Sequence, residues 1–221
     1  MAVFVGAIFA EFFVRGALIV SGDAAATAKN IIASESLWRA GFAIDLIVDA
    51  CYVAVTLILY VVLRPVNRNI SLLAAFFSLV GCVVGIVAAL AHLAPALILG
   101  GADYLKVFAP HQLQALAALS LKLHLYTSDV SLVFFGFYCV TIGYLIFKAS
   151  YFPSFIGVLL ILGGLAYLVN SFGFFLAPTL ASRLIVVLVL PFIGELSLML
   201  YLIVVGVNVT KWQEEASRAA S

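Results

Sequence analysis

Charge is what this 221-residue sequence most lacks: 10% of its residues are Asp, Glu, Lys or Arg, against about a quarter in a typical soluble domain. The 11 basic residues nearly balance the 10 acidic ones, so no basic surface is expected that would hold nucleic acid. Hydrophobic residues make up 66% of the chain, more than a soluble domain of this size can bury. The composition excludes a soluble enzyme and a disordered chain, and it predicts a polytopic membrane protein.

Cysteine and catalytic motifs are scarce as well. The 3 cysteines are dispersed through apolar runs, which excludes a CxxC pair and a disulfide framework. No HExxH, GxSxG or P-loop motif is present, and these motifs mark the common zinc, serine and phosphate chemistries. Enzymatic activity therefore stays uncertain and is less expected than a binding role. No cofactor is expected, although zinc is kept as a lesser alternative.

What the sequence has instead is a series of long apolar runs, and a membrane-spanning helix needs about 20 such residues. The six runs are residues 2–20, 40–63, 70–99, 112–147, 155–176 and 184–209. We therefore predict an all-α membrane protein, a six-helix transmembrane bundle in a single domain (residues 1–210) with a polar C-terminal tail (residues 211–221). Short surface helices are expected in the two long outer loops.

The distribution of basic residues indicates an orientation. Arg64, Arg68 and Lys148 lie in short turns, which the positive-inside rule assigns to the cytoplasm. We expect a multi-pass protein of the cell membrane with both termini in the cytoplasm. Trp38 and Trp212 stand near the ends of apolar runs and are expected at the membrane–water interface. The lipid bilayer is the expected partner, and a homo-oligomer is compatible with the sequence.

Several polar residues interrupt the apolar runs, where an ionisable side chain costs roughly 2.5–3.5 kcal/mol on insertion scales. They are Glu11, Arg15, Asp45, Asp49, His92, Asp129, Asn170 and Glu195. Counted at about 1.5 Å per residue from the predicted cytoplasmic ends, or from the outer end for Arg15, the residues other than Glu11 fall in the outer half of the membrane or at its rim. Such a layer predicts a polar cavity that opens to the outside. Asp49, Asn170 and Glu195 are expected to face the bundle interior.

The spacing of these residues leaves alternatives open. Glu11 and Arg15 are four residues apart, which favours an ion pair within one helix. Asp45 and Asp49 share a helix face and are compatible with a metal or proton site; alternatively, Asp45 is a helix N-terminal acid and Asp49 bonds to a neighbouring helix. Glu195 has no partner one turn away, so its partner is expected on another helix.

Several segments are similar to a known family. They are Gly22–Ile31, Leu37–Gly41, Leu59–Asn67, Phe134–Tyr138, Tyr151–Leu159 and Pro191–Glu195. The chain resembles, over nearly its whole length, a bacterial family of integral membrane proteins catalogued as domain of unknown function 4386. The resemblance implies six helices and a polar outer layer, and it implies no activity.

Three functions are compatible with these observations. The favoured one is a module that binds or transports a small ligand, an ion or a proton in an outward-facing polar cavity, with Arg15, Asp45, Asp49, Asn170 and Glu195 as binding residues. The second is a membrane-embedded metal-dependent hydrolase, in which zinc would be held by a set of acids and histidines. That set is Asp49, His92, His124 and Asp129. The third is a structural or accessory membrane subunit.

Overall fold

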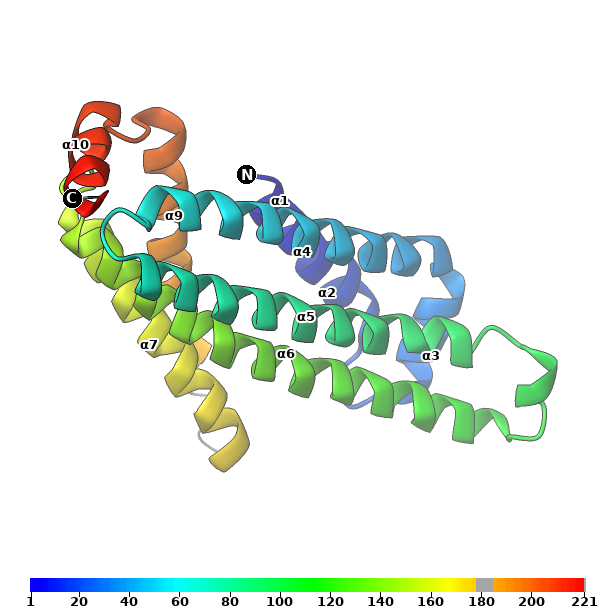
Figure 1. The fold of residues 1–221 in the computed structure, drawn as a ribbon. Helices are drawn as coiled ribbons and strands as arrows, with labels where there is room; N and C mark the ends of the chain where they lie inside the picture. The colour runs from blue at the N-terminus through cyan, green and yellow to red at the C-terminus, as the bar shows by residue number, and fades with distance from the viewer. Residues whose placement is uncertain (178–184, 221) are drawn as a thin grey trace. The chain divides into compact units, whose positions relative to one another are not determined.

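The computed structural model describes residues 1–177 and 185–220, and this part of the chain is a series of helices joined by short connections (Figure 1). The longest are α4 (Glu35–Leu63), α5 (Arg68–Ile98), α6 (Pro110–Lys148) and α7 (Ser154–Leu176), and α9 (Val189–Val204) follows the short helix η3 (Ile185–Leu188). Among the described residues, five helices are long and apolar enough to cross a membrane. The predicted all-helical class is confirmed, and the five helices indicate a multi-pass membrane protein.

The first apolar run does not form one regular helix. It folds as α1 (Ala2–Ile8), the π-helix η1 (Phe9–Arg15) and α2 (Gly16–Leu18), and the chain turns to extended backbone at Ile19. At about 1.5 Å per residue this segment is roughly 26 Å long, shorter than the hydrocarbon core of about 30 Å. The six-helix bundle is therefore not confirmed. Leu184, where the last run was predicted to start, lies outside the described residues.

Both long loops contain a short helix, as predicted. In the first loop, α3 (Ala24–Ala33) is capped by Asp23, whose carboxylate accepts a hydrogen bond from the Ala26 backbone at 2.8 Å. In the second, η2 (Asp103–Leu105) forms a single turn. The C-terminal tail, which was predicted only to be polar, is the helix α10 (Val209–Ala220).

Helix α6 is a single helix of 39 residues, roughly 58 Å long at the α-helical rise. Pro110 occupies its first turn, where the missing N–H costs nothing. Gln112 turns back to accept a hydrogen bond from the Ala109 N–H at 2.8 Å, which satisfies a backbone donor before the helix. The long fourth helix that the sequence predicts is thus present.

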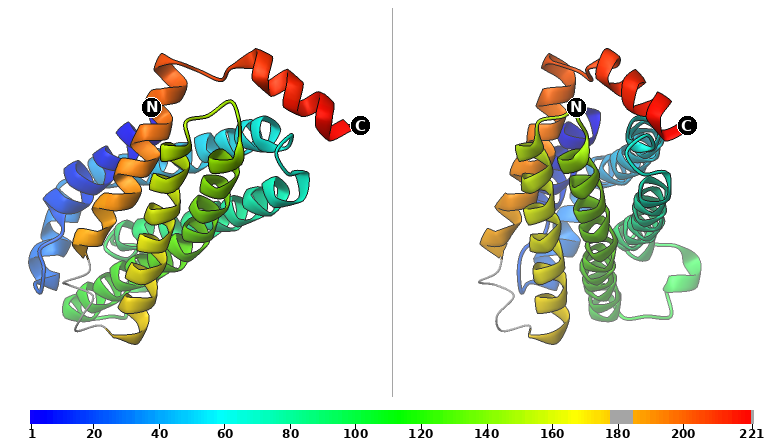
Figure 2. Two further views of the ribbon diagram at one scale, coloured as in Figure 1. Left: turned by 90° about the vertical axis from the view of Figure 1, so that its left-hand side faces the viewer. Right: turned by 60° about the vertical axis from the view of Figure 1, so that its left-hand side comes forward.

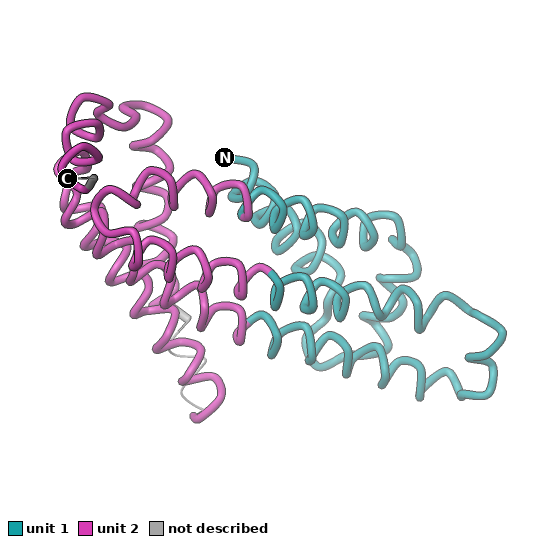
Figure 3. The backbone as a smooth tube through the Cα atoms, viewed as in Figure 1, with its two compact units in different colours: residues 1–52, 83–128 teal, residues 53–82, 129–221 magenta. Residues whose placement is uncertain are grey.

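The described chain divides into two compact units (Figure 3). Unit 1 comprises residues 1–52 and 83–128, and unit 2 comprises residues 53–82 and 129–221. Unit 1 holds α1, η1, α2 and α3 with parts of α4, α5 and α6, and unit 2 holds the remaining parts of these three helices with α7, η3, α9 and α10. A buried cluster forms the core of unit 1, and its members are Val14, Leu18, Ile31, Trp38, Ala96 and Leu121.

In unit 2, α6 and α7 approach so closely that their backbones touch at glycines. A methyl group added to Gly157 would lie 2.5 Å from Gly143 O and 2.5 Å from Phe147 N. About two turns further along α7, a methyl group on Gly164 would lie 2.5 Å from Gly136 O. Apolar helices surrounded by lipid tails gain little from the hydrophobic effect, so small residues that allow close packing drive their association.

Helix α9 packs on α7 by the same means, and the two lie side by side in Figure 2. A methyl group on Gly163 would lie 2.7 Å from Pro191 Cα, and one on Gly194 would lie 2.9 Å from Leu159 O. Pro191 and Gly194 thus place the following Glu195 close to α7. Within unit 2, α6, α7 and α9 are thus held together through their smallest residues.

We predict that Gly157→Ala destabilises the protein. The added methyl group has no room between the two backbones, so it should lower the free energy of unfolding by about 1–3 kcal/mol, the usual cost of overpacking. Unfolding in mild detergent would be followed by circular dichroism. Val169→Leu adds one carbon at an exposed position of the same helix and serves as control. An equal loss in both variants would contradict the close packing.

Candidate functional site

Arg15 is the central charged residue of unit 1. Its Nε donates to Glu11 Oε2 at 2.8 Å, and its two terminal nitrogens donate to Asp45 Oδ2 and Oδ1 at 2.8 and 3.4 Å. The side chains of Arg15 and Asp45 are 11% and 16% exposed, whereas that of Glu11 is 61% exposed. The ion pair expected within the N-terminal helix is present, but the better buried pair joins this segment to α4.

Asp49 follows Asp45 by one turn of α4 and lies against α5. A methyl group on Gly85 would be 3.1 Å from Asp49 Oδ1, so the missing side chain makes room for the carboxylate. The cation beside Asp45 is Arg15. The charge of the Asp45 carboxylate is therefore balanced without a metal ion or a bound proton. The binding roles of Asp45 and Asp49 stay predictions.

Trp38 and His92 form a reciprocal pair in the core of unit 1. The indole N–H of Trp38 donates to His92 O at 2.9 Å, and His92 Nε2 lies 3.2 Å from Trp38 O. The two rings are stacked with centroids 4.0 Å apart, and both side chains are fully buried. The expectation that Trp38 is an interfacial anchor is therefore wrong, because its one donor is used to join α4 to α5.

His124 extends the pair to α6. Its ring centroid is 5.7 Å from that of His92, and its Nδ1 lies 2.8 Å from Ala88 O. A carbonyl oxygen only accepts hydrogen bonds, so His92 Nε2 and His124 Nδ1 are the protonated positions. In each neutral ring the other nitrogen, His92 Nδ1 or His124 Nε2, carries no proton and can accept a hydrogen bond. His92 Nδ1 is buried and has no hydrogen-bond partner among residues 1–177 and 185–220.

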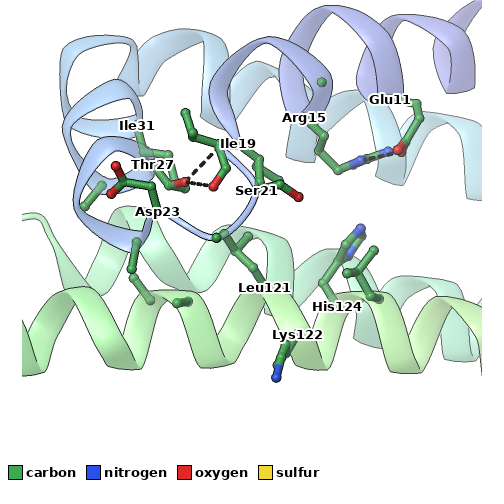
Figure 4. Close-up of a pocket in the computed structure, with 18 residues that line it drawn as sticks. Glu11, Arg15, Ile19, Ser21, Asp23, Thr27, Ile31, Leu121, Lys122 and His124 are labelled. Atoms are coloured by element: carbon green, nitrogen blue, oxygen red, sulfur yellow. Dashed lines mark hydrogen bonds and ion pairs between the residues drawn. The ribbon is translucent and has the colours of Figure 1, made fainter. Parts of the chain in front are cut away.

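A pocket of about 570 Å³ lies beside these groups in unit 1 (Figure 4). Its walls come from the 19–24 loop, α3 and the first part of α6, and they are mostly apolar; Ile19, Ile31 and Leu121 contribute. Glu11, Arg15 and His124 lie at one end of the pocket, whereas Asp23 and Thr27 lie at the other end, where they bond to the backbone of Ala26 and Val20. Figure 4 shows His124 extending from α6 towards the segment that carries Arg15 and Glu11. The pocket thus combines an apolar body with a hydrogen-bonding end.

In unit 2 the half-buried polar residues that the sequence singled out fall into two groups. Asn170 on α7 donates to Asp129 on α6 at 3.2 Å. Glu195 on α9 accepts from the Tyr167 hydroxyl at 3.1 Å and from the Cys139 thiol at 3.7 Å. Glu195 thus finds its partners on other helices. Asn170 and Glu195 bond to different side chains, and their convergence with Asp49, which belongs to unit 1, stays a prediction.

The four residues considered as metal ligands are only partly brought together. His92 and His124 are neighbours in unit 1, whereas Asp129 bonds to Asn170 in unit 2. Among the described residues, no three His, Cys, Asp or Glu side chains form a group that could hold a metal ion. A zinc site therefore stays a prediction, and the described residues provide no group of ligands for it.

Comparison with known proteins places the chain in a family. The family described as "Domain of unknown function (DUF4386)" matches residues 1–206. The chain belongs to this family. The match covers α1 to α9 and both units, so the Arg15 pairs, the two histidines and Glu195 all lie within the family's region.

One curated relative of this family member is an "Uncharacterized protein" of Archaeoglobus fulgidus, 25% identical over 118 residues. The match covers 53% of this chain and 57% of the relative, so the chain spans little more than half the length of the curated protein it matches. No solved structure matches the chain. Neither the family description nor the description of the relative names a ligand or a reaction.

Three features of this family member were missed by the sequence analysis: the Trp38–His92 pair, the donors Tyr167 and Cys139, and the pocket behind the 19–24 loop. Trp38 and His92 are 54 residues apart, and neither belongs to a motif that would signal the pair. Tyr167 and Cys139 looked like ordinary apolar-run residues. Nothing in the pattern of the first loop indicates that α3 forms the wall of a pocket.

We predict that Arg15→Gln is more damaging than removal of the whole pair. Without Arg15 the poorly exposed Asp45 carboxylate has no counter-charge, which should cost about 3 kcal/mol of stability. The double variant Arg15→Gln/Asp45→Asn leaves no unpaired charge, so it should lose less than the single variant. Chemical unfolding in detergent would measure both.

Glu11→Gln is the control, because an exposed ion pair contributes about 0.5 kcal/mol. If Glu11→Gln costs as much as Arg15→Gln, or if the double variant is the least stable of all, the Arg15–Asp45 pair does not hold the N-terminal segment to α4.

A second prediction concerns Glu195. Tyr167→Phe removes a hydroxyl that donates to a half-buried carboxylate, which should lower the free energy of unfolding by about 1.5–3 kcal/mol. Tyr144→Phe removes the same hydroxyl from an exposed position on α6 and should change stability little. Equal effects of the two substitutions on the thermal unfolding midpoint would contradict the assigned bond.

Proposed function

We propose that this chain is a multi-pass membrane protein without catalytic activity that binds a small amphiphilic molecule in the pocket of unit 1. The observation that carries the proposal is the pairing of an apolar pocket of about 570 Å³ with a polar end made by Glu11, Arg15 and His124. Ligand pockets of this size usually have apolar walls and a few polar groups that orient the ligand.

The polar end is suited to a head group that donates hydrogen bonds. Glu11 Oε2 is used by Arg15, which leaves Oε1 as an acceptor. His124 gives its Nδ1 proton to Ala88 O, so its Nε2 is the ring's remaining acceptor position. Of the charged residues that line the pocket, the acids Glu11 and Asp23 equal the basic Arg15 and Lys122 in number, but Figure 4 shows Lys122 pointing away from the other labelled side chains, and Asp45 adds a further carboxylate on Arg15. A neutral or cationic head is therefore favoured over an anionic one.

The placement in the membrane follows from the same proposal. The N-terminal segment exposes large apolar side chains, among them Phe12 and Phe13, which suit contact with lipid. It would be the sixth membrane element, crossing only part of the bilayer. The 64–69 turn would face the cytoplasm, and the pocket of unit 1 would open towards the outer side of the cell membrane.

The two other functions have less support. A zinc hydrolase needs converging ligands, and the described residues contain no such group. A purely structural subunit has no use for a pocket with a polar end. It would, however, use the Arg15–Asp45 and Trp38–His92 pairs equally well, so binding itself must be measured.

Binding would be tested with three probes of equal chain length: decylamine, decanol and decanoate. The protein is placed in phosphatidylcholine nanodiscs and carries Trp212→Phe, so that Trp38 is its one remaining tryptophan. Trp38 shares the buried cluster of Ile31 and Leu121, and both of these line the pocket. We expect saturable changes in its emission with the amine and the alcohol, at lower concentrations than with decanoate.

Two substitutions locate the site. Ala118→Phe fills the pocket from α6 and should abolish the change, whereas Ala115→Phe adds the same side chain at an exposed position outside it. Glu11→Gln should weaken binding of decylamine roughly tenfold, as loss of one charge-assisted bond predicts. Unchanged binding by Ala118→Phe would overturn the proposal.

A further inference from the structure

A second pocket lies in unit 2, at the turn between α4 and α5. Its volume is about 610 Å³, and unlike the pocket of unit 1 it is lined largely by polar groups. Residues 64–69 of the turn form one side, and α10 forms the other through Trp212 and two alanines. No function considered above uses this pocket.

The lining of this turn pocket is positively charged. Arg64 and Arg68 both line it, and no carboxylate among the described residues does. Both arginines are exposed, and neither is in an ion pair within the described part of the chain. Two guanidinium groups that line one cavity and that no described carboxylate neutralises favour an anion.

The start of α5 adds to this charge. Asn67 caps the helix by accepting from Ile70 N–H at 3.0 Å. The N–H groups of Arg68 and Asn69 precede the first regular hydrogen bond of the helix and point to the same end. The dipole of a helix of 31 residues is positive at this end and stabilises a negative charge there. The turn thus carries two guanidinium groups and backbone N–H donors that are suited to an anion.

The wall on the α10 side is fixed rather than loose. Trp212 Nε1 and the Tyr151 hydroxyl both donate to Val62 O, at 2.9 and 2.7 Å. Glu215 accepts from Ser150 N and Oγ at 3.2 and 2.6 Å. Burial, with the nearby charge of Glu215, raises the pKa of Tyr151 above its ordinary value, so its hydroxyl stays a donor. α10 is therefore tied to the end of α4 and to the turn before α7.

The position of the turn points to the source of the anion. The turn joins two helices that are each long and apolar enough to cross a membrane, so it lies at a membrane surface, at the level of lipid head groups. Trp212, half-buried in the wall, is a residue type that favours this level. Arginine is the side chain that binds phosphate with two parallel bonds.

We infer that the turn pocket, through Arg64, Arg68 and the start of α5, binds the phosphate of an anionic lipid head group. The same chemistry would accept a soluble phosphate compound. The inference is independent of the proposed function, because it uses other residues in the other unit.

The test uses the full-length protein in a neutral detergent. Phosphatidylglycerol, phosphatidylcholine and inorganic phosphate are each titrated at constant ionic strength; bound lipid is counted by native mass spectrometry, and inorganic phosphate is added as a competitor. We expect one phosphatidylglycerol to bind in preference to phosphatidylcholine. Arg64→Gln/Arg68→Gln should weaken this binding tenfold or more, because each arginine contributes charge-assisted bonds worth roughly a factor of ten.

Lys148→Gln/Lys211→Gln is the matched control, because it removes the same charge from exposed residues that do not line the pocket. Arg64→Lys/Arg68→Lys keeps the charge and loses the forked geometry, so it should bind several-fold more weakly than the native protein even where the glutamine variant fails to fold. Competition by inorganic phosphate would support the phosphate site and assign it to a soluble compound. Equal binding by the native and lysine proteins, or an equal loss in the control, would overturn the inference.

Discussion

A charged or ring-bearing side chain within an apolar run needs a strong partner that lipid cannot supply, and here that partner lies on another helix, whereas hydroxyl groups such as those of Ser128 and Thr141 bond to a carbonyl of their own helix. The described structure meets this requirement repeatedly. Arg15 reaches Asp45, Trp38 reaches His92, and Glu195 reaches Tyr167. Each contact fixes which helices are neighbours, and each would be costly to break because the abandoned group stays away from water.

Glycine supplies what these polar contacts cannot, which is a short distance between helices. In unit 2 the glycines of α6 and α7 face one another, and those of α7 and α9 meet Pro191 and Leu159. Close approach of the backbones brings Glu195 within reach of Tyr167 and Cys139. In unit 1, Gly6 and Gly41 allow similarly close contacts with Val48 and Val14, and Gly85 makes room for the Asp49 carboxylate. Small residues and polar pairs thus cooperate in both units.

The same requirement explains why the pockets are plausible binding sites. Within the helices, polar groups bond mainly to one another, and hydrogen-bonding capacity is left over where two helices diverge or a turn intervenes. The remaining acceptor positions of Glu11 and His124 face the pocket of unit 1, and the guanidinium groups of Arg64 and Arg68 line that of unit 2. The first set accepts hydrogen bonds and the second donates them, so under the two proposals the pockets would select opposite kinds of head group.

The sequence by itself determined the class of the protein and most of its elements. Apolar runs of membrane length predict helices because the backbone must bond to itself where water is absent, and α4, α5, α6, α7 and α9 appear where such runs were found. It also marked Arg15, Asp45, Asp49 and Glu195, since charge within an apolar run is visible in a single chain. The turn residues Arg64 and Arg68 were seen, but only as a signal of orientation.

Only the tertiary structure decided the partners. Three arrangements depend on contacts between residues 30 to 150 positions apart. Arg15 lies beside Asp45, Trp38 is buried against His92 rather than placed at the interface, and the tail forms a wall over the 64–69 turn. The first run is not confirmed as a spanning helix for a related reason. Its hydrophobicity matches a spanning helix, but the π-helical turn and the early exit at Ile19 accompany pairing with α4. Composition and periodicity report the environment of a residue, whereas the choice among many possible partners is made by packing.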